Sequence, residues 1–197
     1  MAETTRKPPP KQARAAAKRD AILDATEALL GHSTPAEITT RAVARAANVP
    51  VGSIYRYFSN ADDLLRALFS RMNAGTIGLL EDSLSREPFN WRDHVNDMFD
   101  HLRQMHASHP AYGALQAYLD RGQDDDEITH LLQALFEREA PHLGSGLIRN
   151  IILTVTAMID GVERRLPHLP EAHKDTALEQ VRIAVTAYLS HHLSQQS

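Results

Sequence analysis

Histidine is the residue type whose number and spacing most suggest chemistry in this sequence. Of eleven histidines, four lie close together: His94, His101, His106 and His109. His94 and His101 are seven residues apart, so on a helix they share a face, where imidazoles can gather a metal ion. The chain has no cysteine, and the sequence shows no clear carboxylate partner at ligand spacing for these histidines. We therefore interpret them as solvated or core-edge side chains, and expect no metal and no other cofactor.

Carboxylates give two further candidate metal motifs. Glu127–His130 and Glu139–His142 both match the Glu-x-x-His pattern of di-iron helical bundles, but Pro141 would break the helix that must present the second pair. The acidic run 124–127 lacks the ligand spacing and central glycine of a calcium loop, so we interpret it as a helix N-terminus. The sequence also contains no Gly-x-Ser-x-Gly, Ser-x-x-Lys or phosphate-binding glycine motif. These absences favour a binding protein without catalytic residues over an enzyme.

The segment from Pro50 to Tyr57 has side chains suited to reading a DNA groove. It begins with the small residues Val51, Gly52 and Ser53 and continues with Tyr55, Arg56 and Tyr57. A glycine permits close approach, a valine can meet a thymine methyl group, and an arginine can fork onto guanine. Tyrosine hydroxyls can bind phosphates. Two tyrosines and an arginine on an outward face indicate a major-groove surface.

The flanking residues predict the two short helices that would carry this surface. Thr39 can cap a first helix, whose apolar residues recur at helical spacing: Ala42, Val43, Ala46 and Ala47. Asn48 stands where the turn needs a residue tolerant of positive φ, and Pro50 suits the first turn of the next helix. That helix is expected to run over 52–57, with Ile54 and Phe58 facing inward.

These residues resemble the TetR (tetracycline-repressor-like) family of bacterial transcription regulators. The resemblance is dense over about one-third of the chain and rests on Thr39–Ala44, Ala47–Val49, Gly52–Phe58 and Leu64–Leu65. Beyond it, only the helical plan and the pair Asp160–Gly161 are similar. Many family members carry Gly at position 48, Ser at 50, and Lys at 51 and 61, where this chain has Asn48, Pro50, Val51 and Ala61. The absent lysines are phosphate anchors in the family.

The resemblance implies an all-α protein with an N-terminal three-helix helix-turn-helix DNA-binding domain and a C-terminal helical ligand-binding and dimerisation bundle. It implies a homodimer, more a repressor than an activator, that a small effector releases from a palindromic operator. Thr39, Thr40 and Arg45 are expected to touch phosphates of double-stranded DNA, and Val51, Gly52, Ser53 and Arg56 to read bases, with Tyr55 and Tyr57 on phosphates. The alternative is a ligand-binding or scaffold protein of this fold that does not read DNA.

The charge distribution favours a polyanionic partner at one end of the chain. Residues 1–60 contain nine Lys/Arg and five Asp/Glu, a balance of +4, and the total of −4 leaves −8 for the rest. We expect a basic flexible arm over 1–17, the helix-turn-helix domain over 18–65 with a first helix from about Gln12 to Leu30, and the effector-binding and dimerisation domain over 66–197. Arm residues such as Arg6 and Lys7 could follow phosphates or simply keep the protein soluble.

We expect a cytoplasmic protein from the distribution of apolar residues along the chain. No apolar run reaches the roughly 20 residues that cross a bilayer, and the polar, proline-rich start has no signal-peptide core.

Ser59 or Asn60 can cap a long helix that extends toward Leu84 and links the two domains. Gly75 and Gly78 would weaken its middle by about 1 kcal/mol each relative to Ala.

Bulky, polarizable residues with a few polar tips mark a candidate effector pocket in the second domain. They are Trp91, Met98, Leu102, Met105, Tyr112, Tyr118, Phe136 and Met158. A helical bundle of this size also needs such side chains to fill its core, so that alternative stays open for each residue.

The last two helices carry the dimer prediction. Their apolar stripes include the expected interface residues Ile152, Val155, Ile159, Val162, Val181, Val185, Tyr188 and Leu189. Further apolar residues lie beside the stripes: Leu153, Ala157, Met158, Ile183, Ala184 and Ala187. A helix that is apolar on more than one face needs two neighbours, and in a small chain the second neighbour is expected to be another copy. A thick monomer core is the alternative.

Overall fold

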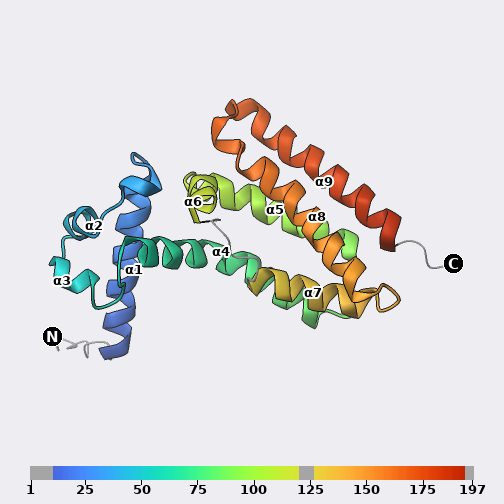
Figure 1. The fold of residues 1–197 in the computed structure, drawn as a ribbon, viewed down its shortest axis with the longest axis horizontal. Helices are drawn as coiled ribbons and strands as arrows, with labels where there is room; N and C mark the ends of the chain where they lie inside the picture. The colour runs from blue at the N-terminus through green and yellow to red at the C-terminus, as the bar shows by residue number, and fades with distance from the viewer. Residues whose placement is uncertain (1–10, 120–126, 194–197) are drawn as a thin grey trace, which may run out of the picture. The chain divides into compact units, whose positions relative to one another are not determined.

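The computed structural model describes residues 11–119 and 127–193, and within these ranges every regular element is helical (Figure 1). The predicted all-α class is therefore confirmed. The chain divides into two compact units, Met1–Leu68 and Phe69–Ser197. Helix α4, Ala61–Ser85, begins in the first unit and ends in the second. The acidic run 124–127 falls outside the described ranges except for Glu127, the first residue of α7.

The first unit is a small helical cluster. It comprises α1 (Lys11–Leu30), a 3₁₀ turn (Pro35–Glu37), α2 (Thr40–Ala46), α3 (Val51–Ile54) and the first turns of α4. Its core consists of side chains at most 8% exposed: Ile22, Leu23, Leu30, Ile38, Val43, Ala44, Ile54, Phe58, Leu64, Leu65 and Leu68. Because α1 begins at Lys11, residues 11–17 of the expected flexible arm are helical. The remainder of that arm, with Arg6 and Lys7, lies outside the described residues.

Local capping explains where α4 begins. The Asn60 side chain accepts a hydrogen bond from Asp63 N at 2.8 Å, and the Asp63 carboxylate accepts one from Ser59 N at 2.7 Å. These bonds satisfy backbone donors at the helix start, and Asp62 and Asp63 also suit the positive end of the helix dipole. The cap predicted from the sequence at Ser59 or Asn60 is therefore present, at Asn60.

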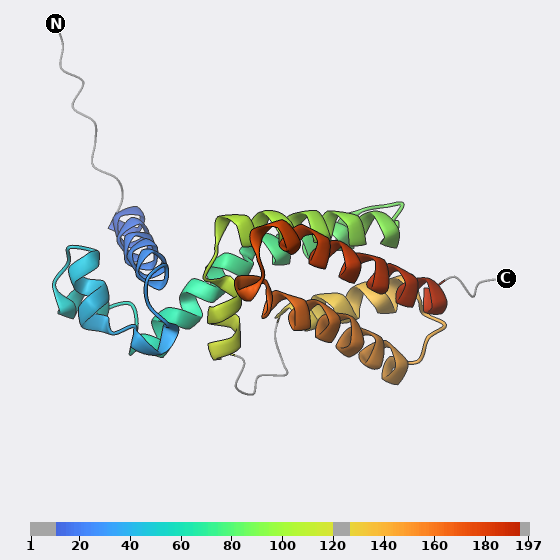
Figure 2. The same cartoon turned by 90° about the horizontal axis from the view of Figure 1, so that it is seen from above.

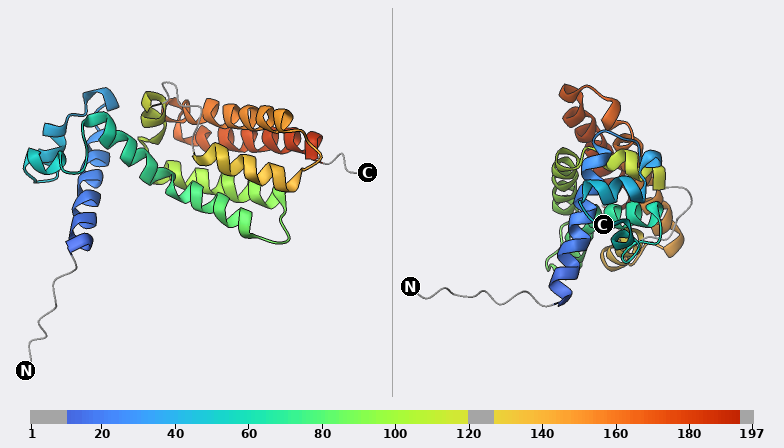
Figure 3. Two further views of the ribbon diagram at one scale, coloured as in Figure 1. Left: turned by 60° about the horizontal axis from the view of Figure 1, so that its bottom comes forward. Right: turned by 90° about the vertical axis from the view of Figure 1, so that its left-hand side faces the viewer.

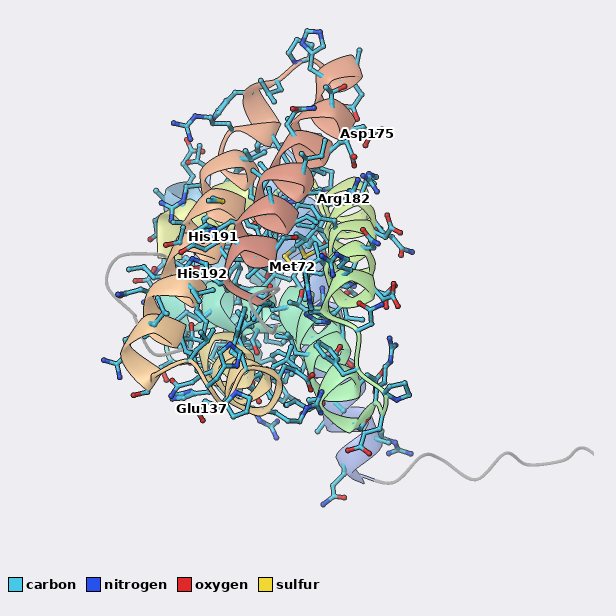
Figure 4. All side chains as sticks on the ribbon, turned by 90° about the vertical axis from the view of Figure 1, so that its right-hand side faces the viewer. Met72, Glu137, Asp175, Arg182, His191 and His192 are labelled. Atoms are coloured by element: carbon cyan, nitrogen blue, oxygen red, sulfur yellow. The ribbon has the colours of Figure 1, made fainter. Side chains whose placement is uncertain are left out.

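The second unit is a bundle built from the rest of α4 and five further helices. These are α5 (Trp91–Ser108), α6 (Tyr112–Leu119), α7 (Glu127–Glu139), α8 (Ser145–Glu163) and α9 (Glu171–Leu193), with a 3₁₀ turn at Leu166–His168. Helices α8 and α9 run side by side in opposite directions (Figures 2 and 3), while α5 packs on α9 and α7 on α8. Polar bonds join α5 to α9: Arg182 donates to Asn96 Oδ1 at 2.9 Å. Figure 4 shows Arg182 and Asp175 on α9 beside α5.

Candidate functional site

The turn between α2 and α3 has the geometry that the sequence predicts. Thr39 caps α2, and its hydroxyl accepts a hydrogen bond from Ala42 N at 3.2 Å. Asn48 has φ 52°, the left-handed conformation that Asn tolerates best among residues with a side chain. Val49 N then donates to Ala44 O at 2.9 Å, which closes the turn over the end of α2. The turn that joins the two helices is thus closed by a backbone hydrogen bond.

Helix α3 is shorter than expected. It covers Val51–Ile54, whereas the sequence pattern predicted a helix over 52–57, and residues 55–57 form a turn. Tyr57 N donates to Ile54 O at 2.9 Å, an i to i−3 bond that tightens the chain after the helix. Ile54 and Phe58 are buried, as predicted from their spacing of four. The inward contacts are kept even though the regular helix ends early.

The outer surface of this segment is open. Tyr55 is 57% exposed and Val51 37%, while Gly52 and Arg56 are also exposed. A Cβ at Gly52 would meet nothing within 4 Å, so the backbone there is free for close approach by a large partner. Ser53 and Tyr57 are half-buried. Apolar and aromatic surface is thus left exposed beside a basic side chain, in the arrangement that a groove-reading element requires.

The first motif helix contributes hydroxyl and basic groups on the same unit. Thr39, Arg41 and Arg45 are exposed and Thr40 is half-buried. The Thr40 hydroxyl lies 3.2 Å from the Tyr55 hydroxyl, so α2 and the turn after α3 are joined by a bond between two groups that were each expected to touch phosphates. This pairing could not be predicted from the sequence, because the residues are fifteen positions apart and meet only through the crossing of the helices.

A second contact places a basic residue of α1 on this unit's core. The Arg19 guanidinium lies 5.6 Å from the centre of the Phe58 ring, at cation–π distance, while Arg19 remains exposed. Lys18 is half-buried and Arg14 is exposed. The unit therefore displays cationic side chains from α1 and α2 together with the hydroxyl and aromatic groups around α3, a combination suited to phosphate backbones and base edges.

The predicted effector residues lie in the second unit. Leu102, Met105, Tyr112 and Phe136 are buried, and Trp91, Met98, Tyr118 and Met158 are half-buried. Tyr112 carries the polar tip that the prediction required: its hydroxyl donates to Asn73 Oδ1 at 2.8 Å, and its ring stacks on Phe69 at 5.3 Å. These contacts are equally those of a filled core, so the pocket assignment stays a prediction.

A buried hydrogen bond beside Tyr112 has no counterpart in the sequence predictions. Glu163 is 2% exposed, and its Oε1 lies 2.9 Å from Nε2 of His106, whose ring meets Tyr112 edge-on at 5.4 Å. One turn away, Gln116 Nε2 donates to Asp160 Oδ1 at 3.0 Å. Helix α6 sits close to this pair, since a Cβ at Gly113 would lie 2.8 Å from Glu163 O. The second unit thus has a polar centre where α5, α6 and α8 meet.

The two histidines that shared a predicted helix face bind hydroxyl groups. His94 Nδ1 lies 2.7 Å from Ser83 Oγ and His101 Nε2 lies 3.1 Å from Thr76 Oγ1. Burial lowers the pKa of His94 to about 4, against the opposing field of Asp97, and burial also lowers the pKa of His101. Among the residues that the structure describes, no group of three or more His, Cys, Asp or Glu side chains is placed to hold a metal.

Four of the expected dimer residues pack inside the subunit itself. Ile152, Val155, Val185 and Leu189 are at most 9% exposed, so they belong to the subunit's own core. Ile159, Val162, Val181 and Tyr188 are half-buried. The exposed apolar side chains of α8 and α9 are those beside the stripes: Leu153 at 66%, Ile183 at 49% and Leu147 at 41%. Helical periodicity found both apolar faces but assigned the inner one to the partner.

Comparison with known proteins identifies the first unit. Residues 22–68 match the family model described as "Bacterial regulatory proteins, tetR family", a span that contains α2, α3 and their turn. No protein of curated function matches the sequence.

Solved structures with the same fold cover almost the whole chain. A TetR-family transcriptional regulator from Streptomyces coelicolor is 24% identical with a TM-score of 0.72, and the match covers 89% of this chain and 99% of that one. The fatty acid degradation regulator FadR from Bacillus halodurans is 18% identical with a TM-score of 0.66 (91% and 96%). NalD, the secondary repressor of the MexAB-OprM multidrug efflux pump in Pseudomonas aeruginosa, is 19% identical with a TM-score of 0.66 (88% and 97%).

Proposed function

We propose that this chain, whose first unit is the DNA-binding domain of the TetR family and whose fold is that of the family's regulators, acts as a dimeric repressor. A small effector bound in the second unit would release it from a palindromic operator in the cytoplasm. The role is one of binding rather than catalysis. NalD, which shares the fold, is a repressor, and this supports the direction of regulation.

The observation that carries the proposal is the open surface around α3. Four residues remain exposed here: Val51, Gly52, Tyr55 and Arg56. Exposing the apolar surface of Tyr55 and Val51 to water does not stabilise the protein, so this exposure is typical of a binding surface. A scaffold protein that does not read DNA would have no use for this surface, so that alternative is not favoured. We propose that Arg56, Val51, Gly52 and Ser53 meet base edges and that Thr40, Arg45, Tyr55 and Tyr57 hold phosphates.

Thr39 fits a phosphate contact with a second role. Its hydroxyl oxygen accepts the capping bond from Ala42 N, which leaves the hydroxyl hydrogen free to donate to a phosphate oxygen. The residue would then both start α2 and bind DNA. Positions 51 and 61 carry no lysine, so phosphate attachment in this chain would rest on other basic residues of the first unit and on hydroxyl groups.

The exposed apolar face of α8 and α9 supports the dimer. Leu153 and Ile183 project from neighbouring antiparallel helices, and Ala157, Ala184 and Ala187 are exposed on the same two helices. Small side chains allow two copies of the helix pair to approach closely in a two-fold four-helix packing. We propose that this outer face forms the interface, with Ile159, Val162, Val181 and Tyr188 at its half-buried edge.

The polar centre supports an effector site in the second unit. Tyr112, His106 and Glu163 offer hydrogen-bonding groups among the buried side chains of Leu102, Met105 and Phe136. Effector pockets are commonly apolar with a few orienting polar groups. We propose that the effector binds here and favours a spacing of the two α3 helices that no longer matches major grooves about 34 Å apart.

The test is to capture genomic DNA with the purified protein and to sequence the retained fragments. The proposal predicts a two-fold symmetric site with half-sites about 10 base pairs apart, or a multiple of that. The logarithm of the affinity should fall steeply and linearly with the logarithm of the salt concentration, with a shallower slope after deletion of residues 1–10. Retention of random sequence, or a slope unaffected by Arg45→Gln, would contradict it.

A further inference from the structure

Helices α4 and α5 are joined by two histidine–hydroxyl contacts that are one heptad apart. Thr76 Oγ1 meets His101 Nε2 at 3.1 Å, and Ser83 Oγ meets His94 Nδ1 at 2.7 Å. Ser83 follows Thr76 by seven residues and His94 precedes His101 by seven, so the two contacts repeat in register along an antiparallel pair. We call these four side chains the histidine seam. They connect α4 and α5 within the second unit.

The seam is tightly packed. Ser83 is 1% exposed, Thr76 7% and His94 9%, and His101 is half-buried. A Cβ at Gly75 would lie 2.6 Å from His101 Cε1, so the imidazole rests directly against the backbone of α4. The Ser83 hydroxyl donates to Leu79 O at 2.8 Å, which makes His94 Nδ1 the donor in their contact. The imidazoles are thus held as neutral rings between two helices.

The charged groups around α5 do not stabilise the protonated forms of both His94 and His101. Asp97 faces His94 and favours its protonated form, but Arg86 opposes it, and Arg138 of α7 binds the carbonyl oxygens of Ser83 and Leu84 beside it. Where α5 meets α9, Arg103 is already paired with three carboxylates: Asp100, Asp175 and Glu179. For His101, burial lowers the pKa of the imidazole.

We propose that the histidine seam is a proton-sensitive joint, in which protonation of His94 and His101 loosens α4 from α5 and thereby lowers the affinity for DNA. The effect on DNA rests on the proposed function. The route is α4 itself, one continuous helix from Ala61 to Ser85. Its first turns contribute the fully buried Leu64 and Leu65 to the core of the DNA-binding unit, and its later turns contribute Thr76 and Ser83 to the seam.

The direction of the pH effect follows from the pKa of the imidazole in the closed seam and in the released form. Burial lowers the pKa of His94 to about 4, whereas a released imidazole has a pKa near 6.5. The closed seam therefore keeps its full stability above pH 6.5 and loses it as the pH falls toward 4. For His94 alone, release becomes about 20-fold more favourable at pH 5 than at pH 7. The lowered pKa of His101 adds in the same direction.

The test compares the wild-type chain with the double variant His94→Asn, His101→Gln. The Asn amide can donate to Ser83 in place of Nδ1, and the Gln amide can replace Nε2 toward Thr76, so both contacts are kept without a titrating group. The matched control is His142→Gln, His173→Gln, which removes two exposed histidines of the same chain. The probe for DNA affinity is a genomic fragment retained by the wild-type protein.

We expect wild type and control to lose DNA affinity between pH 7 and pH 5, by up to about 20-fold beyond the change in the double variant. The hydrogen exchange of the backbone amides of residues 76–85, corrected for the intrinsic exchange rate at each pH, should become faster between pH 7 and pH 5. We expect this in the wild type and the control but not in the double variant. Equal pH dependence in all three proteins would overturn the proposal. Ring-proton NMR of the wild-type chain decides without any variant: titration of His94 near pH 6.5 would also overturn it.

The two proposals fail separately. If the protein retains no specific DNA but the exchange of α4 and the ring titration behave as described, the seam stands as a proton-sensitive joint and the DNA-binding function is wrong. If specific DNA is retained and the double variant keeps the wild-type pH dependence, the function stands and the seam proposal is wrong.

Discussion

Two glycines of α4 make a matched test of the packing between α4 and α5. Gly75 and Gly78 stand one turn apart in the same helix, and each costs about 1 kcal/mol of helix stability relative to Ala. A Cβ at Gly78 would meet nothing within 4 Å, whereas one at Gly75 would lie 2.6 Å from His101 Cε1. We therefore predict that Gly78→Ala raises the free energy of unfolding by about 0.5–1 kcal/mol.

Gly75→Ala should have the opposite sign. The added methyl group forces the His101 ring away, which removes its bond to Thr76, worth about 1 kcal/mol, and leaves that hydroxyl buried without its partner, at a further cost of about 1–3 kcal/mol. After the gain in helix propensity, we expect a net loss of about 1–3 kcal/mol. The single tryptophan, Trp91 on α5, reports urea unfolding of this unit by fluorescence, at one fixed protein concentration.

A further variant, His101→Ala, completes a double-mutant cycle with Gly75→Ala. In a chain that lacks the imidazole, Gly75→Ala has nothing to displace and should stabilise the protein as much as Gly78→Ala does. Equal stabilisation by the two alanines in the wild-type background would refute the reasoning, because it would mean that His101 is not held against α4. It would also remove one of the two contacts of the histidine seam.

Four further predictions follow from the site and the core. Tyr55→Phe and Tyr57→Phe should weaken binding to cognate and random DNA alike in gel-shift assays, since the hydroxyls are proposed to hold phosphates; unchanged affinity would contradict this. Leu153→Glu should convert the dimer to a monomer in sedimentation at micromolar protein, while Arg149→Glu, on the same helix, should not. Glu163→Ala should lower the free energy of unfolding by about 1–3 kcal/mol, because the buried bond to His106 is lost, and Glu163→Gln by less. Asn48→Gly should be neutral or stabilising and Asn48→Val destabilising by about 1–2 kcal/mol, measured by urea unfolding.

Features set by local chemistry could be predicted from the sequence. Asn48 was assigned a positive φ because the turn between two helices needs one, and its φ is 52°. The sequence predicts a cap at Thr39 and another at Ser59 or Asn60, because such side chains can satisfy the first backbone donors of a helix, and Thr39 and Asn60 do so. The inward direction of Ile54 and Phe58 followed from their spacing of four. Each of these depends on residues fewer than five positions apart.

Features set by the crossing of helices could not be predicted in this way. The period of an amphipathic helix shows that two faces of α8 are apolar, but not which one packs inside the subunit. Ile152 proves buried and Leu153 exposed. The partners of His94, His101 and His106 were missed for the same reason. Each lies on another helix, and the sequence shows only that the imidazoles share a segment.

Helix α8 shows how the two kinds of apolar face can be told apart once the fold is known. With the turn that follows, it is long and apolar enough to cross a membrane by length and composition, and only 22% of its most apolar window is buried in the subunit. A membrane-spanning helix would be apolar around its whole circumference, whereas α8 keeps Arg149 and Asn150 exposed and forms a buried hydrogen bond through Glu163. Its inner residues Ile148, Ile151 and Ile152 are covered by the subunit's own bundle. Leu153 remains uncovered, and the neighbouring helix α9 leaves Ile183 uncovered. The proposed two-fold packing with a second copy of this helix pair would cover both side chains and leave the polar groups of α8 exposed.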